Sequence, residues 1–128
     1  MSIDLKQNNM KVDIILSDGF VMTELSGVVD VLRLANRVVD KKMFTFRYVS
    51  PEAGVVKSSA DTWLNASALS NSPDADIAVF LGNSDLNFTS REIEKAVHKY
   101  RYTNAKVVLL AEAAAIYIYR LILMMDLG

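Results

Sequence analysis

Two glutamates follow apolar runs at positions where α/β enzymes commonly place acid and base groups. Glu24 follows the run at 11–17 (KVDIILS), and Glu112 follows the run at 106–110 (KVVLL). Two carboxylates can serve as acid and base when their surroundings push their pKa values apart. Each glutamate also begins an expected helix, where the helix dipole stabilises a carboxylate whatever its function. The residues alone leave both interpretations open.

The junction after residue 110 has the form of a nucleophile elbow without a nucleophile. An expected buried strand runs directly into an expected helix, as at the elbow that holds a catalytic serine in many hydrolases. Here the junction reads Ala111, Glu112, Ala113, Ala114, and the chain contains no cysteine. Disulfides, thiolate nucleophiles and cysteine-bound metals are therefore excluded.

The other candidate groups favour structural roles. His98, the single histidine, lies in the middle of an expected helix among lysines and arginines, which is typical of a solvent-exposed face. Asp74 and Asp76 precede an apolar run and more simply begin a strand than bind a metal. The chain has no phosphate-binding glycine motif and no metal-ligand spacing, so we expect no catalytic residue, no metal site and no cofactor.

Apolar patterning predicts alternating strands and helices. Strands are expected at 11–17, 44–49, 75–81 and 106–110, with short accessory strands at 55–58 and 62–65 and a loop over 66–74. Apolar residues spaced by three and four predict a helix over 23–38, capped by Thr23, with Leu25, Val29 and Val38 on its buried face. A second helix begins at Thr89, with Glu92 at capping-box spacing. A third runs over 112–127.

This alternation predicts one α/β domain over residues 1–128. The expected fold is a flavodoxin-like three-layer sandwich with a mostly parallel sheet of order 2-1-3-4, which could be incomplete. Ligands of such folds bind beyond the carboxyl ends of the strands. The candidate binding crevice therefore comprises Glu24, Gly82, Asn83, Ala111 and Glu112.

Bulk properties exclude several function classes. The 128 residues carry a formal net charge of −1, without the basic excess of a nucleic-acid-binding module. The N-terminus is polar and unlike a secretory signal, and the most apolar stretch, 113–125, is interrupted by Arg120. We expect no membrane partner and a cytoplasmic location.

Two stretches resemble a known family. DGFVMTELSGVVDVLRLAN at 18–36 and FRYVSPEAGVVKSSADTWL at 46–64 are similar to the N-terminal sensor domain of AraC-type transcription regulators. That domain belongs to the ThiJ/PfpI, class I glutamine amidotransferase-like superfamily. The resemblance runs in order through the whole chain and weakens after residue 70.

The resemblance implies a ligand-sensing, dimerising domain that has lost catalysis. Glu24 matches the acidic residue beside the family's reactive cysteine, and Ala111 stands at the position of that cysteine. Gly82-Asn83 replaces a glycine pair that supplies oxyanion-binding amides. The implied partners are a second copy, an unidentified small-molecule effector, and DNA through a C-terminal helix-turn-helix region outside these residues. The alternative is a ThiJ/PfpI-type hydrolase or hydratase that uses Glu24 and Glu112.

The end of the sequence is unusually apolar. Val107 to Leu110 is apolar at every position, which predicts a strand buried on both faces. The expected helix that follows is apolar nearly all round and needs cover on more than one side. We therefore expect either the N-terminal part of a longer chain or a second chain that supplies the cover.

Overall fold

The computed structural model describes residues 9–40, 43–83, 90–110, 113, 117–118 and 121–125. Its elements follow the order β1 (Met10–Ile15), α1 (Met22–Val38), β2 (Phe44–Ser50), β3 (Gly54–Lys57), β4 (Trp63–Ala68), β5 (Ile77–Phe80), α2 (Ser90–Tyr102) and β6 (Lys106–Leu109). Residues 121–125 are also helical. The part described is therefore mixed α/β, as the sequence predicts.

The sheet has six strands in the order β3-β4-β2-β1-β5-β6. Neighbouring strands from β4 to β6 are parallel, and only the hairpin pair β3 and β4 is antiparallel. The central run β2-β1-β5-β6 is the predicted order 2-1-3-4. The accessory strands extend the sheet beyond β2, because β4 continues to Ala68 and pairs with Val49 and Ser50. The predicted loop at 66–74 is thus wrong over its first three residues.

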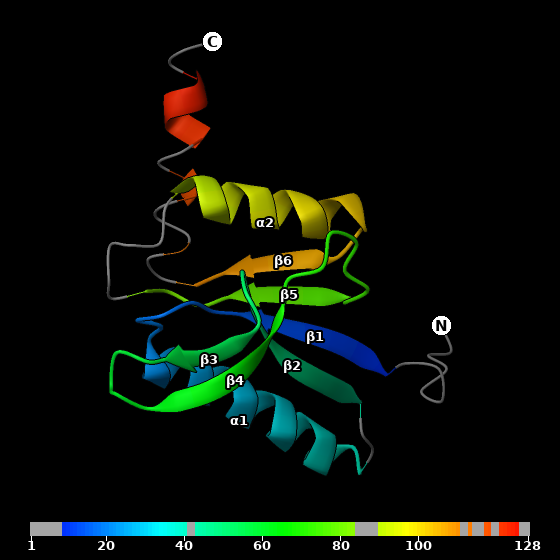
Figure 1. Ribbon diagram of the computed structural model, residues 1–128. Coiled ribbons are helices and arrows are strands. Elements are labelled where there is room, and N and C mark those ends of the chain that lie inside the picture. Colours follow the sequence, from blue (N-terminus) through cyan, green and yellow to red (C-terminus); the bar gives the residue numbers. More distant parts are fainter. Residues whose placement is uncertain are drawn as a thin grey trace.

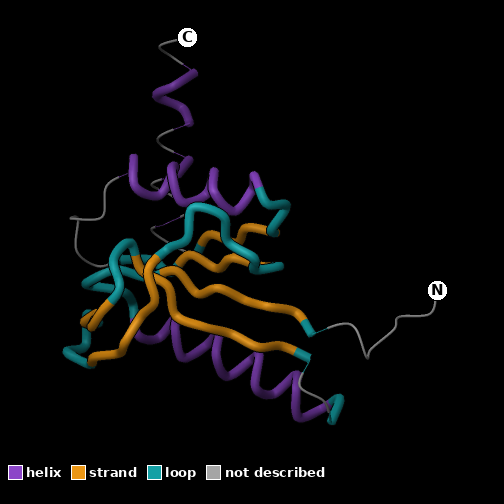
Figure 2. The backbone as a smooth tube through the Cα atoms, turned by 45° about the vertical axis from the view of Figure 1, so that its right-hand side comes forward, coloured by secondary structure: helices purple, strands orange, loops and turns teal. Residues whose placement is uncertain are grey.

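Helices α1 and α2 cover opposite faces of the sheet (Figures 1 and 2). The α1 side buries Val12 and Ile14 of β1, and Leu16 just after it, against Leu25 and Val29. The α2 side buries a second cluster drawn from alternate strand positions and from α2, comprising Ile15, Val49, Ala78, Phe80, Ile93, Ala96, Val97 and Tyr100. Alternation along β1 sends its side chains to both layers, which explains why its buried residues are apolar apart from Asp13.

A charged network lies within the α2 layer. Asp13, on β1, is 2% exposed and accepts a hydrogen bond from the Tyr100 hydroxyl at 2.7 Å. Arg47, on the neighbouring strand β2, donates to both carboxylate oxygens of Asp13, at 2.7 and 3.2 Å. Burial, followed by the hydrogen bond to Asp13, raises the pKa of Tyr100 far above its ordinary value. The network ties α2 to the centre of the sheet and leaves Asp13 fully partnered.

Helix α1 begins one residue earlier than expected. Val21, not Thr23, is the N-cap, and no side chain caps the helix. The N–H groups of Glu24 and Leu25 both donate to the Val21 carbonyl, while the Val21 N–H donates to Gly82. The start of α1 is therefore set by a backbone contact with the end of β5 rather than by a capping side chain. Thr89, the predicted cap of α2, lies outside the described residues.

Two predictions of burial are wrong. Val38, expected on the inner face of α1, is 75% exposed. Val108 of β6 is 43% exposed, although the sequence predicted burial on both faces. Strand β6 is an edge of the described sheet. Helix α1 lies over β1 and β2, in the other half of the sheet (Figure 1). Val108 therefore stays partly exposed in the described part of the protein.

Candidate functional site

The carboxyl ends of the five parallel strands meet at one edge of the sheet. Residues 16–21 leave β1 there and are held on both sides by backbone hydrogen bonds. The Gly19 N–H donates to the Lys57 carbonyl at 2.8 Å, and the Val21 N–H donates to the Gly82 carbonyl at 3.1 Å. Gly19 has φ +90°, a conformation that glycine adopts without strain, so Asp18-Gly19 forms the predicted turn.

Glu24 and Gly82 are in direct contact. The Glu24 Oε1 atom accepts a hydrogen bond from the Gly82 N–H at 2.8 Å. Glu24 comes from the first turn of α1, and Gly82 lies two residues beyond β5. The amide that could have bound an oxyanion is thus occupied by a carboxylate of the same chain.

Asn83 also points into the protein rather than into an open crevice. It is 6% exposed, and its Nδ2 atom donates to the Ser17 hydroxyl and to the Asp18 carbonyl, both at 2.7 Å. These bonds join the end of β1 to the end of β5. Asn83 therefore shapes the edge of the site, and the sequence gives no signal of this role beyond its place after an apolar run.

The other predicted crevice residues, Ala111 and Glu112, lie outside the described residues. The structure brings together Glu24, Gly82 and Asn83 at the expected edge of the sheet. The described residues on either side of Ala111 and Glu112 are Leu110 and Ala113. Ala113 is buried in the α2 layer, and its N–H donates to the Leu110 carbonyl at 2.9 Å.

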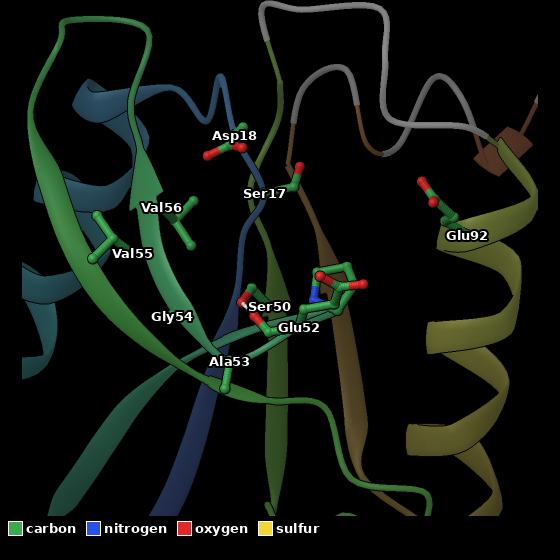
Figure 3. A pocket seen from close by; sticks show the side chains of 10 residues that line it. Ser17, Asp18, Ser50, Glu52, Ala53, Gly54, Val55, Val56 and Glu92 are labelled. Carbon is green, nitrogen blue, oxygen red and sulfur yellow. Dashed lines mark hydrogen bonds between the residues drawn. The ribbon is translucent and has the colours of Figure 1, made fainter.

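A cavity of about 370 Å³ opens at this edge (Figure 3). The hairpin β3–β4 lies on one side of it, and α2 lies on the other. Its lining comes from the end of β1, the turn after β2, strand β3 and the first turn of α2: Ser17, Asp18, Ser50, Pro51, Glu52, Ala53, Gly54, Val55, Val56 and Glu92. That size suits a small metabolite.

Three carboxylates and no cationic side chain stand among these lining residues. They are Asp18, Glu52 and Glu92, and all three are exposed. Asp18 accepts a hydrogen bond from the Lys57 N–H at 3.0 Å, and the Ser50 hydroxyl donates to the Glu52 carbonyl. The cavity thus favours a ligand that carries hydrogen-bond donors or positive charge.

Sequence reasoning missed the turn at 50–54 as part of the site. The signal was present, because strand 44–49 was expected to lie parallel to the first strand. Its carboxyl end, and therefore the turn that follows it, had to reach the same edge of the sheet.

Among the described residues no cluster of three or more histidine, aspartate or glutamate side chains could hold a metal ion. No described helix has the length and apolarity needed to cross a membrane.

Comparisons with known proteins rest on structure alone. No protein-family model matches the chain. No curated protein matches it either.

The solved structures that share the fold include the following three. An AraC family transcriptional regulator from Pseudomonas putida superposes with a TM-score of 0.72 at 24% identity, over 84% of this chain and 68% of that one. A DJ-1 superfamily protein from Agrobacterium tumefaciens gives 0.65 at 17% identity, over 84% and 56%. A putative transcriptional regulator from Vibrio parahaemolyticus gives 0.64 at 14% identity, over 85% and 60%. The flavodoxin-like fold is confirmed, and the chain spans little more than half the length of two of these proteins.

Proposed function

We propose that this chain is a ligand-sensing and dimerising regulatory domain of an AraC-type transcription regulator, without catalytic activity of its own. The fold shared with two proteins that are named as transcriptional regulators supports a regulatory domain. In this proposal the protein acts in the cytoplasm, and DNA is bound by a helix-turn-helix region that follows residue 128.

The residues at the strand-to-helix elbow and at Gly82 support the loss of catalysis. The chain has alanine at 111 and no cysteine anywhere. The Gly82 amide, which an acyl-transfer enzyme would direct at a developing oxyanion, instead donates to Glu24. The Glu24 carboxylate is therefore a structural acceptor that joins α1 to the end of β5.

The proposal of ligand sensing rests on one observation, the cavity beyond the carboxyl ends of the strands. It lies at the edge where α/β folds bind ligands, and its lining comes from four separate parts of the chain. A ligand held there would contact the hairpin, the β1 end and α2 at once. Such a ligand could change how these elements pack and so pass a signal to the rest of the protein.

A thermal-shift screen of the full-length protein tests this function. We expect at least one amine-bearing or donor-rich metabolite to raise the Tm. The variant Ala53→Trp, which fills the cavity from its exposed turn, should abolish that rise. The control Ala60→Trp places the same ring on an exposed turn outside the cavity lining and should retain it.

DNA binding supplies the second half of the test. Genomic fragments retained by the full-length protein should change in affinity when the screened metabolite is added. A protein that retains no specific fragment would contradict the regulator proposal. If the metabolite bound Ala53→Trp as tightly as the wild type, the sensing cavity would be misplaced.

A further inference from the structure

Helix α1 carries a second apolar stripe on the side away from the sheet. We define the outer stripe as Gly27, Val31, Leu34 and Val38. Its three large side chains are 65%, 54% and 75% exposed, in that order. At 100° per residue these positions lie opposite Leu25 and Val29, which are buried against the sheet. The stripe is therefore additional to the face that holds the helix in the fold.

The spacing of the outer stripe is that of a helix-pairing seam. Successive members are four, three and four residues apart, as in the core positions of a coiled coil. From Gly27 to Val38 the stripe extends about 16 Å along the helix. A second helix laid along it would bury all three exposed side chains.

The stripe is complementary in shape to an antiparallel copy of itself. When Val31 of one copy packs beside Leu34 of the other, Gly27 comes to lie opposite Val38 in both directions. Gly27 has open space around it, since a Cβ there would meet no atom within 4 Å. The smallest member of the stripe thus faces its most exposed member, which lets the two helices approach closely.

The charges beside the stripe are also complementary to a copy. Asp30 and Arg37 flank the same side of it, seven residues apart and opposite in sign, and both are exposed. The same antiparallel pairing places Asp30 within about 3 Å, along the helix axis, of Arg37 in the second copy. The two-fold symmetry makes this charge pair occur twice. An unrelated partner would need its own opposite charges at both positions.

The helix is held rigidly enough to act as a docking surface. Asn36 accepts a hydrogen bond from the Phe44 N–H at 2.8 Å and donates to the Phe44 carbonyl at 3.0 Å. Arg33 turns towards the sheet and lies 5.9 Å from the centre of the Phe46 ring. Asp30 and Arg37 are thus left as the charges that border the stripe on that side.

We infer that the outer stripe of α1 is the homodimer interface, formed by antiparallel packing of α1 against α1 of a second copy. This inference deepens the proposed function, because it rests on the homodimer proposed above and assigns it to a surface. It commits to a second copy as the occupant. A different partner, or a later part of the same chain, would leave the protein monomeric in solution.

Sedimentation equilibrium of the full-length protein tests the interface. The variant Gly27→Gln should raise the dimer dissociation constant at least about tenfold, because its side chain occupies the space of Val38 from the other copy. The same variant has room in the monomer and improves helix propensity, so it should fold. The control Ser26→Gln adds the same side chain beside the stripe and should leave the constant unchanged.

A charge exchange tests the antiparallel arrangement separately. Asp30→Arg alone should weaken the dimer by a factor of about 2 to 10. The double variant Asp30→Arg with Arg37→Asp should restore it, because the reversed pair can form again across the two-fold axis. Additivity of the two single changes would contradict the antiparallel pairing.

The sedimentation results can distinguish a wrong interface from the absence of a homodimer. A dimer whose constant is unchanged by both Gly27→Gln and Leu34→Glu would overturn the α1 interface while leaving the homodimer intact. A wild-type protein that is monomeric at tens of micromolar would overturn both the interface and the homodimer. Neither result would affect ligand binding in the cavity, which the Ala53→Trp comparison measures independently.

Discussion

At the scale of residues, Glu24 shows how one carboxylate can be assigned a role by its partner. An acid–base group needs its oxygens directed at a substrate, whereas Glu24 directs Oε1 at the Gly82 N–H. The same residue type at the same helix start could serve either purpose. The hydrogen bond decides between them, and it can be removed without changing the charge on any other group.

Substitutions of Glu24 should separate a structural role from a catalytic one. Glu24→Ala leaves the Gly82 N–H without its acceptor and should lower the free energy of unfolding by about 1–3 kcal/mol. Glu24→Gln keeps an acceptor oxygen and should lose less than half of that. Urea unfolding followed by circular dichroism measures both. If Gln proved as destabilising as Ala, the negative charge and not the hydrogen bond would be the stabilising feature.

Tyr100 gives the protein a specific response to high pH. Because its pKa is raised in the folded state, the folded protein holds this proton more tightly than the unfolded chain does. The resulting stabilisation is fully present below pH 10 and is lost as the pH rises above it. We expect the free energy of unfolding to fall above pH 10 by up to about 1.4 kcal/mol per pH unit.

The variant Tyr100→Phe provides the matched comparison. It removes the hydroxyl, so this part of the pH dependence should disappear, and stability near pH 7 should fall by about 1–3 kcal/mol because Asp13 loses a donor. Tyr102→Phe is the control, since Tyr102 is 88% exposed. An unchanged alkaline slope in Tyr100→Phe would show that another group causes the loss of stability.

At the scale of elements, the sequence predicted what depends on periodicity and missed what depends on contacts. The four main strands and their order follow from apolar spacing, and both are confirmed. The start of α1 was wrong by one residue because Val21 and Gly82, 61 residues apart, fix it through their backbones. Glu24 lies at the expected edge of the sheet, but its role as acceptor for the Gly82 N–H could not be read from spacing.

Asn36 holds the end of α1 against β2, and its removal should loosen that junction. Asn36→Ala loses both bonds to Phe44 and should cost about 1–3 kcal/mol. Hydrogen exchange at the Phe44 amide should quicken more than exchange at Ile14, which lies in the buried centre of β1. Equal acceleration at both sites would mean that the junction opens only when the whole domain unfolds.

At the scale of the whole molecule, two separate surfaces each gather several exposed apolar side chains. One is the outer stripe of α1. The other is the helical segment 121–125, which projects beyond α2 in Figures 1 and 2. In that segment Ile122, Met124 and Met125 are 51%, 48% and 78% exposed. Apolar surface of this kind drives association between molecules.

The two surfaces should contribute different kinds of self-association. For residues 1–128 in isolation, we expect sedimentation velocity to show dimers and larger species. Serine at 122, 124 and 125 together should remove the larger species and leave the dimer, because those side chains lie apart from the outer stripe. Gly27→Gln should do the reverse. Larger species that persist in the serine variant would place the second contact elsewhere, such as the β6 edge.

The hairpin carries a built-in optical probe. Trp63, the single tryptophan, is 65% exposed on β4, and its ring lies 5.3 Å from the Lys57 ammonium of β3. The same strand β3 lines the cavity through residues 54–56. A ligand that moves this strand would change the distance between the ammonium and the indole, and with it the fluorescence of the whole protein. Occupancy of the cavity can therefore be followed in real time by emission from one residue, without any label.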